Sequence, residues 1–406
     1  MSAMTRKPAR SRGPSGVMVM LMGASLALNA GSGAIFALVA EIQKAHHFST
    51  ADLGYITGSL FLSMVVCLLT LSHLADRGHA RLMLLVGLAV GTAALVWIAV
   101  ADRLWEFVAA RALSGLALSL FLAAGRSIVV RLDPDDVGQN LGRLTASEVS
   151  GFVVGPVIGS LLFRLGGLST PFWCLAGAAA LATVFFMVRF PADMGAIDTP
   201  RSSMAWWRLS GLDLLSDRKV VAAALFGLAL YLPIGVYDSL WAKYLTDLGA
   251  SSTFVGVSLT IWGVPLILFS GRGGRLVDRV GSRTGTTWGL VLMVPVLFLY
   301  GALGSYWTVV SVAIVEALAS TVAMPGAQAA MAQACPPERI AAGQGLGALT
   351  GLSTAGLIGS IAPAIYQAHG PFQLFTGLAI GVALLAAAGW ALSSPHGATV
   401  PDAVPG

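Results

Sequence analysis

Charged residues are scarce in this chain of 406 residues, because Asp, Glu, Lys and Arg together make up only 11% of it. A soluble domain carries roughly a quarter charged residues. A chain so poor in charge cannot present a mainly polar surface to water. The composition therefore argues against a soluble globular protein.

The chain also lacks motifs for a disulfide, a metal site or a nucleotide site. Its cysteines, Cys67, Cys174 and Cys335, lie far apart without metal-ligand spacing, which argues against disulfides and a metal site. The glycine-rich run 343–347 follows no predicted strand, and the run 271–274 is not part of a Gly-Lys-Ser/Thr element, so nucleotide binding is not expected. We expect no cofactor, no metal and no enzymatic reaction.

Hydrophobic residues are abundant instead, at 56% of the chain with a mean hydropathy of +0.80. A helix needs about 20 apolar residues to cross about 30 Å of hydrocarbon. Successive apolar runs predict an all-α membrane protein with twelve transmembrane helices. They cover approximately residues 16–42, 52–74, 80–101, 104–131, 141–166, 170–190, 219–247, 252–274, 284–303, 306–334, 340–368 and 371–393.

The positions of Lys and Arg predict the orientation of these helices, because cytoplasmic loops retain basic residues. With a cytoplasmic N-terminus, all but five of the 24 basic residues fall on the cytoplasmic side. The exceptions are Lys44, Arg103, Arg111, Arg164 and Lys243. Both termini are therefore expected in the cytoplasm, with the chain crossing the cell (inner or plasma) membrane many times. The basic excess forms no continuous face, so no nucleic-acid partner is expected.

A polar break rich in Pro and charge divides the chain into two halves. The predicted parts are an N-terminal tail (1–15), a six-helix bundle (16–190), a cytoplasmic linker (191–218), a second six-helix bundle (219–393) and a C-terminal tail (394–406).

A charged turn repeats between the two halves. Residues 274–283 read Gly-Arg-Leu-Val-Asp-Arg-Val-Gly-Ser-Arg, and residues 72–81, 202 positions upstream, read Ser-His-Leu-Ala-Asp-Arg-Gly-His-Ala-Arg. At the same offset Gly54 corresponds to Gly256. The repeat indicates that two pseudo-symmetric bundles arose by duplication, as in many transporters.

The second turn matches Gly-x-x-x-Asp-Arg-x-Gly-x-Arg at every position, and the chain resembles the major facilitator superfamily over residues 16–393. The first turn departs from that pattern, because Ser72 replaces the first glycine and the later one is displaced to Gly78. The resemblance implies the major facilitator fold and a gate: a glycine where helices touch, and charges that close the cytoplasmic side. The gating residues it implies are Asp76, Arg77, Arg81, Gly274, Asp278, Arg279, Gly281 and Arg283.

The fifth span extends the resemblance. Residues 151–160 match Gly-x-x-x-Gly-Pro-x-x-Gly-Gly, an element associated with the antiporter branch, except for the final Ser160. Gly151, Gly155 and Gly159 form one smooth helix face, and Pro156 bends the helix. By family association this hinge favours export; a close-packing helix without directional meaning is the alternative.

Arg111 and Gly115 resemble the family's Arg-x-x-x-Gly element in the fourth span. An arginine inside a span costs about 2.5 to 3.5 kcal/mol unless it faces a polar interior or has a partner. The resemblance implies that Arg111 modulates a nearby acid in a proton-coupled transporter.

Acidic residues inside the spans are candidates for proton coupling or cation interaction. Glu316 is predicted near the middle of its span. Asp238 shares a helix face with Tyr231 and Trp241, and such an aromatic, acidic wall suits an amphiphilic or cationic substrate. The pattern suits equally well a structural acid paired with Lys243.

The first span carries a polar stripe of Ser25, Asn29, Ser32 and Phe36 at helical spacing. A helix that lines a substrate cavity would show this pattern. Small polar residues that pack against a neighbouring helix are the alternative.

These patterns predict a secondary active transporter that binds its substrate between the two bundles and alternates access. The predicted activity is proton-coupled efflux of small hydrophobic or amphipathic compounds. The alternatives are uptake or facilitated transport of a polar solute such as a sugar or organic acid, and transport of lysolipids or glycolipids. The expected partners are the substrate, protons and membrane lipid, and the chain is expected to act as a monomer.

Overall fold

Long α-helices dominate the computed structural model, which describes residues 16–71, 74–132, 137–190, 211–336 and 339–393. The helices are α1 (Gly16–His46), α2 (Asp52–Thr70), the π-helical turn η1 (Ala75–His79), α3 (Ala80–Val100), α4 (Leu104–Leu132), α5 (Val137–Gly166), α6 (Thr170–Arg189), the 3-10 turn η3 (Leu212–Ser216), α8 (Arg218–Asp247), α9 (Ser252–Val280), α10 (Ser282–Ala302), α11 (Tyr306–Ala334) and α12 (Ile340–Leu392). Eleven of them are long and apolar enough to span a membrane, and these ranges contain no strand. The all-α prediction is confirmed for this part of the chain.

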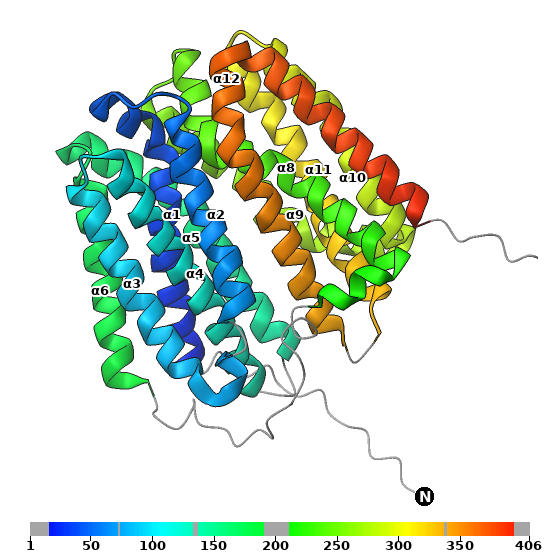
Figure 1. Cartoon of the computed structure of the whole chain (residues 1–406), viewed down its shortest axis with the longest axis horizontal. Helices are drawn as coiled ribbons and strands as arrows, with labels where there is room; N and C mark the ends of the chain where they lie inside the picture. Colours follow the sequence, from blue (N-terminus) through cyan, green and yellow to red (C-terminus); the bar gives the residue numbers. More distant parts are fainter. Residues whose placement is uncertain (1–15, 72–73, 133–136, 191–210, 337–338, 394–406) are drawn as a thin grey trace, which may run out of the picture.

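The longest helix, α12, consists of two membrane helices. Gly370 interrupts it with φ 81° and ψ 178°, and Pro371 follows. Glycine adopts such a positive φ without strain, and proline suits the first turn of a new helix. Figure 1 shows the orange segment rising to this break and the red segment descending from it. The segments 340–369 and 371–392 are therefore separate spans, which gives the predicted twelve.

The helices form two bundles that lie side by side (Figure 1). The N-terminal bundle comprises α1 to α6, and the C-terminal bundle comprises α8 to α12. The face where α1 begins and α12 ends is termed the terminal face here; the opposite one, which carries the connections 47–51 and 248–251, is termed the loop face. The predicted tails 1–15 and 394–406 lie outside the described residues, and the predicted linker 191–218 is described only from Gly211 onward.

The described end of the linker is attached to the C-terminal bundle. Both terminal nitrogens of Arg339 donate to the carboxylate of Asp213, and Leu214 is buried in a cluster with Val220 and Leu346. The Asp213 hydrogen bonds raise the pKa of Arg339 above its usual value. Arginine is charged throughout the physiological pH range, and the two parallel contacts make this ion pair geometrically specific.

The glycines of α5 bring this helix directly against α1. A Cβ added at Gly151, Gly155 or Gly159 would lie 2.4 to 2.9 Å from the nearest atom of α1. Small residues allow such close approach between membrane helices. The smooth face predicted for these three glycines is therefore the contact face between α1 and α5.

Gly155→Leu is expected to lower the thermal stability of the purified protein, because the new side chain would collide with the Ala30 carbonyl. Overpacking of this kind costs about 1–3 kcal/mol. Gly177→Leu in α6 is the matched control, since an added Cβ there meets nothing within 4 Å. Equal melting temperatures for the two variants would contradict the role of α5 as a tightly packed helix.

Glycines at equivalent positions also bring each bundle into close contact with the other. A Cβ added at Gly54 of α2 would lie 2.1 Å from the carbonyl oxygen of Ser360 in α12. One added at Gly256 of α9 would lie 2.4 Å from the hydroxyl oxygen of Ser160 in α5. Since Gly54 and Gly256 are the pair matched by the 202-residue offset, the duplicated helices contact the opposite bundle in the same way.

Candidate functional site

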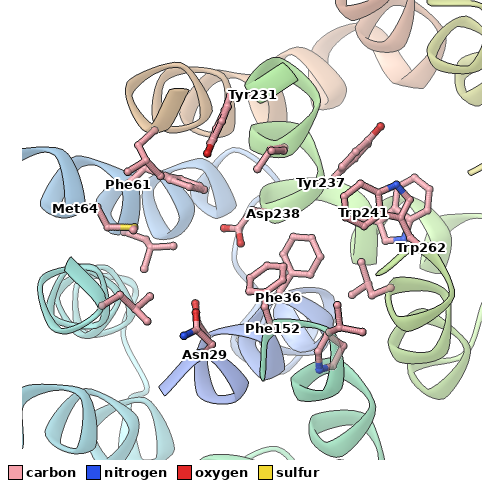
Figure 2. A pocket seen from close by; sticks show the side chains of 18 of the residues that line it. Asn29, Phe36, Phe61, Met64, Phe152, Tyr231, Tyr237, Asp238, Trp241 and Trp262 are labelled. Carbon is pink, nitrogen blue, oxygen red and sulfur yellow. The ribbon is translucent and has the colours of Figure 1, made fainter. Parts of the chain in front are cut away.

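A cavity of about 260 Å³ lies between the two bundles. Its wall comes from α1, α2, α4 and α5 on one side and from α8, α9, α11 and α12 on the other. Figure 2 shows Asp238 and Asn29 among aromatic and apolar side chains such as Phe61 and Met64. A mainly apolar wall with a few polar groups is typical of small-molecule sites.

Five of the six residues predicted to line a substrate cavity do line this one. Asn29, Ser32 and Phe36 come from α1, and Tyr231 and Trp241 come from α8.

Ser25 is the exception. It is fully buried one turn before Asn29, whose side-chain amide donates to its carbonyl oxygen at 2.9 Å. The cavity wall on α1 therefore begins one turn later than the polar stripe predicts.

An ion pair joins the two bundles beside the cavity. Arg111 Nη2 of α4 lies 3.1 and 3.2 Å from the two carboxylate oxygens of Asp238 in α8. The exposed fractions of these side chains are only 2% and 3%. Arg111 also donates to Ser32 Oγ at 3.1 Å, and the Thr57 hydroxyl donates to the Asp238 carbonyl at 3.5 Å. The arginine thus has the partner that an intramembrane arginine requires.

Lys243 is not the partner of Asp238. It forms an ion pair with Asp247, one helical turn further along α8. A spacing of four residues places two side chains on one face of a helix, whereas a spacing of five does not. The alternative that paired Asp238 with Lys243 was therefore wrong.

Glu316 of α11 lines another part of the cavity and is 1% exposed. The Tyr300 hydroxyl donates to its Oε2 atom at 2.7 Å. Among the described residues, its Oε1 atom, the Tyr237 hydroxyl and the Trp262 indole nitrogen make no hydrogen bond of good geometry, although the Tyr237 and Trp262 donors lie close enough to interact with the Glu316 carboxyl group. Buried polar groups normally have partners. These poorly aligned polar groups face one another in the cavity wall, where a ligand could complete their hydrogen bonds.

The rings around Glu316 form a connected aromatic cluster. Tyr237 contacts Trp241 and Trp262 edge to face, with ring centroids 5.4 and 6.2 Å apart, and Trp241 contacts Tyr300 at 5.4 Å. Aromatic faces attract cations, most strongly where water is excluded. The cluster and the carboxyl group can together accommodate a positively charged group attached to an apolar body.

Sequence reasoning missed Tyr237, Trp262 and Tyr300. Tyr237 lies on a different face of α8 from the one predicted for Tyr231, Asp238 and Trp241. Trp262 and Tyr300 have no acidic residue close to them in the sequence that would draw attention to them. The signal that could have found Tyr237 and Trp262 is their position well inside a span, because such residues usually occur at the membrane interface.

The charged turns lie at the terminal face. Arg77, Asp278 and Arg279 are exposed, and among the described residues they make no ion pair with the opposite bundle. Arg283 contacts its own bundle, with its guanidinium 3.6 Å from the centre of the Trp390 ring. The gating role therefore stays a prediction.

The remaining residues of the two turns are partly described. Arg81 is partly buried, whereas the side chain of Asp76 lies outside the described residues.

The glycines of the two charged turns do not all have the structural roles that the motif implies. An added Cβ meets nothing within 4 Å at Gly274, whereas at Gly273 it would lie 1.9 Å from the Thr321 carbonyl oxygen. The helix contact expected at Gly274 is thus made one residue earlier. Gly281 and Gly78 both have φ 88°, so the displaced glycine of the first turn supplies the same positive φ one position earlier.

Hydrogen bonds between the bundles lie at the level of the cavity or nearer the loop face. Ser252 donates to Glu41, and the Ala51 amide donates to the Gln367 side chain. Among the described residues, no hydrogen bond or ion pair joins the bundles between the cavity and the terminal face. The bundles are therefore held together at the loop face, at the top of Figure 1.

Two family models match the chain. One, described as Major Facilitator Superfamily, matches residues 20–240, and the other, described as MFS_1 like family, matches residues 149–377.

Curated relatives are named as multidrug resistance proteins. The chain is 27% identical over 233 residues to the multidrug resistance protein MdtG of Serratia proteamaculans, covering 55% of this chain and 56% of the relative. It is 26% identical over 244 residues to MdtG of Proteus mirabilis, covering 58% and 59%. The chain thus spans less than two thirds of the length of the curated relatives it matches.

Solved structures share the fold at low sequence identity. The nucleoside transporter NupG (D323A mutant) has a TM-score of 0.80 at 15% identity and covers 93% of this chain and 100% of its own. A bacterial homologue of the human lysosomal transporter Spinster, in an inward-facing and unoccupied conformation, has a TM-score of 0.75 at 14% identity, covering 94% and 98%. At these identities the comparison supports the two-bundle architecture alone.

Proposed function

Because the chain belongs to the major facilitator superfamily, and the relatives and solved structures that it matches are transporters and not enzymes, we propose that it exports small amphipathic compounds in exchange for protons. The observation that carries the proposal is Glu316. It is a buried carboxyl group in a cavity between two bundles, surrounded by neutral donors and without a charged partner among the described residues.

Alternating access follows from where the bundles touch. The distribution of Lys and Arg supports a terminal face on the cytoplasmic side, and a state held together at the loop face then receives substrate from that side. Opening of the loop face separates Arg111 from Asp238 and parts the contacts of Gly54 and Gly256. The charged turns at 72–81 and 274–283 then close the terminal face, with the hinge in α5 accommodating the motion.

Asp238 and Glu316, the two acids that line the cavity, take different roles. Asp238 is held by Arg111 across the bundle interface, so it acts as part of a latch between the bundles, and Arg111 controls it. Glu316 can bind and release a proton without breaking an ion pair, so it is the proton-carrying group. A proton and a substrate cation compete for the same carboxylate, and such competition is what an exchange of one for the other requires.

The cavity wall selects an apolar body with a positively charged nitrogen. Phe36, Phe61 and Met64 provide adaptable apolar contacts, while Tyr237 and Trp262 surround the carboxyl group. A wall with so few polar anchors discriminates weakly between apolar shapes. The naming of the MdtG relatives as multidrug resistance proteins supports a broad substrate range.

Transport in proteoliposomes tests this function. A fluorescent amphipathic cation serves as the substrate, and a pH-sensitive dye reports proton movement. We expect an imposed pH gradient to drive the cation uphill, with protons moving in the opposite direction, because both use Glu316. A protonophore should abolish the uphill component.

Two outcomes contradict the proposal. One is uphill transport that survives the protonophore. The other is transport of a sugar, an organic acid or a lysolipid in preference to the cation, which would favour one of the alternative substrate classes.

A further inference from the structure

The side-chain amide of Asn29 is held in one orientation at the wall of the cavity between the bundles. Its Nδ2 atom donates to the Ser25 carbonyl oxygen, one turn earlier in α1, at 2.9 Å, and lies 3.5 Å from Ser25 Oγ. A backbone carbonyl can only accept a hydrogen bond, so the amide nitrogen occupies this side and the amide oxygen the other. The Oδ1 atom of Asn29 therefore points away from Ser25.

The amide oxygen of Asn29 is available to a ligand. Asn29 is half-buried and lines the cavity, and Figure 2 shows its oxygen, in red, on the side toward Asp238. Ser32 and Asp238 in the same wall accept hydrogen bonds from Arg111. The Oδ1 atom of Asn29, by contrast, accepts no hydrogen bond from the residues that the structure describes. It is therefore a neutral acceptor that faces the contents of the cavity.

Helix α5 restrains the Asn29 side chain at its base. A Cβ added at Gly151 would lie 3.0 Å from Asn29 Cβ and 2.5 Å from the Leu26 carbonyl oxygen, so the α5 backbone lies directly against this part of α1. The contact with α5 at the base and the hydrogen bond to Ser25 at the tip leave the amide little freedom. A group that is fixed before a ligand arrives loses less conformational entropy on binding. The acceptor is therefore preorganised.

Asn29 and Glu316 face the same cavity from opposite bundles. Asn29 belongs to α1, and Glu316 belongs to α11. The Trp262 indole lies close to the Glu316 carboxyl group, and Figure 2 shows Trp262 and Asn29 well apart, on different sides of the cavity. A ligand that reaches both Asn29 and Glu316 is therefore elongated and carries a polar group at each end.

We propose that Asn29 selects among substrates by accepting a hydrogen bond from a hydroxyl or N–H group at the end opposite the charged nitrogen. This inference rests on the proposed function, because it places that nitrogen at Glu316. The substrate class is then an elongated apolar cation with a hydrogen-bond donor at its uncharged end. An ether or a carbonyl group at that end fits less well, because two acceptor oxygens would face each other without a shared proton.

Binding of synthetic cations to the purified full-length protein, measured by titration calorimetry, tests the proposal. Each probe is an alkyl trimethylammonium ion that ends in a hydroxyl or a methoxy group, and both sets cover several chain lengths. We expect the hydroxyl-to-methoxy affinity ratio to rise once the chain is long enough to reach Asn29 from Glu316. At that length Asn29→Leu, which has a similar shape without the acceptor, should lower the ratio about two- to ten-fold, the effect of one neutral hydrogen bond. With shorter chains the variant should leave the ratio unchanged.

Met64→Leu is the matched control, because it changes another side chain of the same wall without removing a hydrogen-bonding oxygen. It should keep the wild-type ratio at every chain length. The role of Asn29 is overturned if the ratio in the wild type does not depend on chain length, if Asn29→Leu leaves it unchanged at all lengths, or if Met64→Leu lowers it equally.

Glu316→Gln distinguishes this inference from the proposed function. It should weaken the binding of the hydroxyl and methoxy ions by the same factor, so that the ratio stays at its wild-type value. If Glu316→Gln leaves both affinities unchanged while the ratio still depends on Asn29, the cation site fails and the acceptor role stands. If it weakens both while the ratio does not respond to Asn29→Leu, the cation site stands and the role of Asn29 fails.

Discussion

Replacement of Glu316 by glutamine is expected to abolish proton-driven transport while the protein stays folded. Glutamine has nearly the same shape and can still accept the hydrogen bond from Tyr300, but it can neither carry a proton nor attract a cation. The apparent affinity for an amphipathic cation should fall about ten- to hundred-fold, as expected for the loss of a charge-assisted hydrogen bond of about 1.5–3 kcal/mol. Uphill transport should drop to background, whereas exchange of substrate down its own gradient should persist.

Glu148→Gln is the control for this experiment. Glu148 is also an acid in a membrane helix, but it does not line the cavity, and it lies 3.7 Å from Arg126 in its own bundle. The control should retain uphill transport, measured in the same vesicles and normalised to protein content. The assignment of the proton to Glu316 fails if Glu316→Gln still drives uphill transport, or if Glu148→Gln alone abolishes it.

The architecture could be predicted from the sequence because it depends on local properties. Each span is an apolar run of sufficient length, and even the double nature of α12 follows from a single Gly-Pro step at 370–371. The duplication could also be read directly, since Gly54 and Gly256 keep the same offset as the charged turns. Nothing in these signals depends on which helices become neighbours.

The site could be predicted only in part, because its chemistry depends on those neighbours. Glu316, Asp238 and Arg111 stand out as ionisable residues in apolar helices, which local sequence reveals. The pairing of Arg111 with Asp238 brings together side chains from α4 and α8 that are 127 positions apart in the sequence. Helical periodicity within one span does not predict such a contact. The different roles of Glu316 and Asp238 likewise depend on their surroundings in the folded protein.

Removal of either partner of the Arg111–Asp238 pair is expected to destabilise the protein strongly. Both side chains are almost fully buried, so a single replacement leaves an unpaired charge in a medium of low polarity. Such losses cost about 3–5 kcal/mol, whereas replacement of both partners by apolar residues is often close to neutral. Arg111→Leu and Asp238→Leu should each lower the melting temperature, and the double variant should recover most of the loss.

The same three variants separate a latch from a merely structural contact. A pair that only supports folding would give a double variant that regains both stability and transport. A latch that must close and open in each cycle predicts instead that the double variant regains stability but still transports slowly, because one of its two states has lost the interaction that favours it. Near-neutral single variants, or losses that simply add in the double variant, would contradict a coupled pair across the bundles. Full recovery of transport in the double variant would leave Glu316 as the working acid and assign the pair to folding alone.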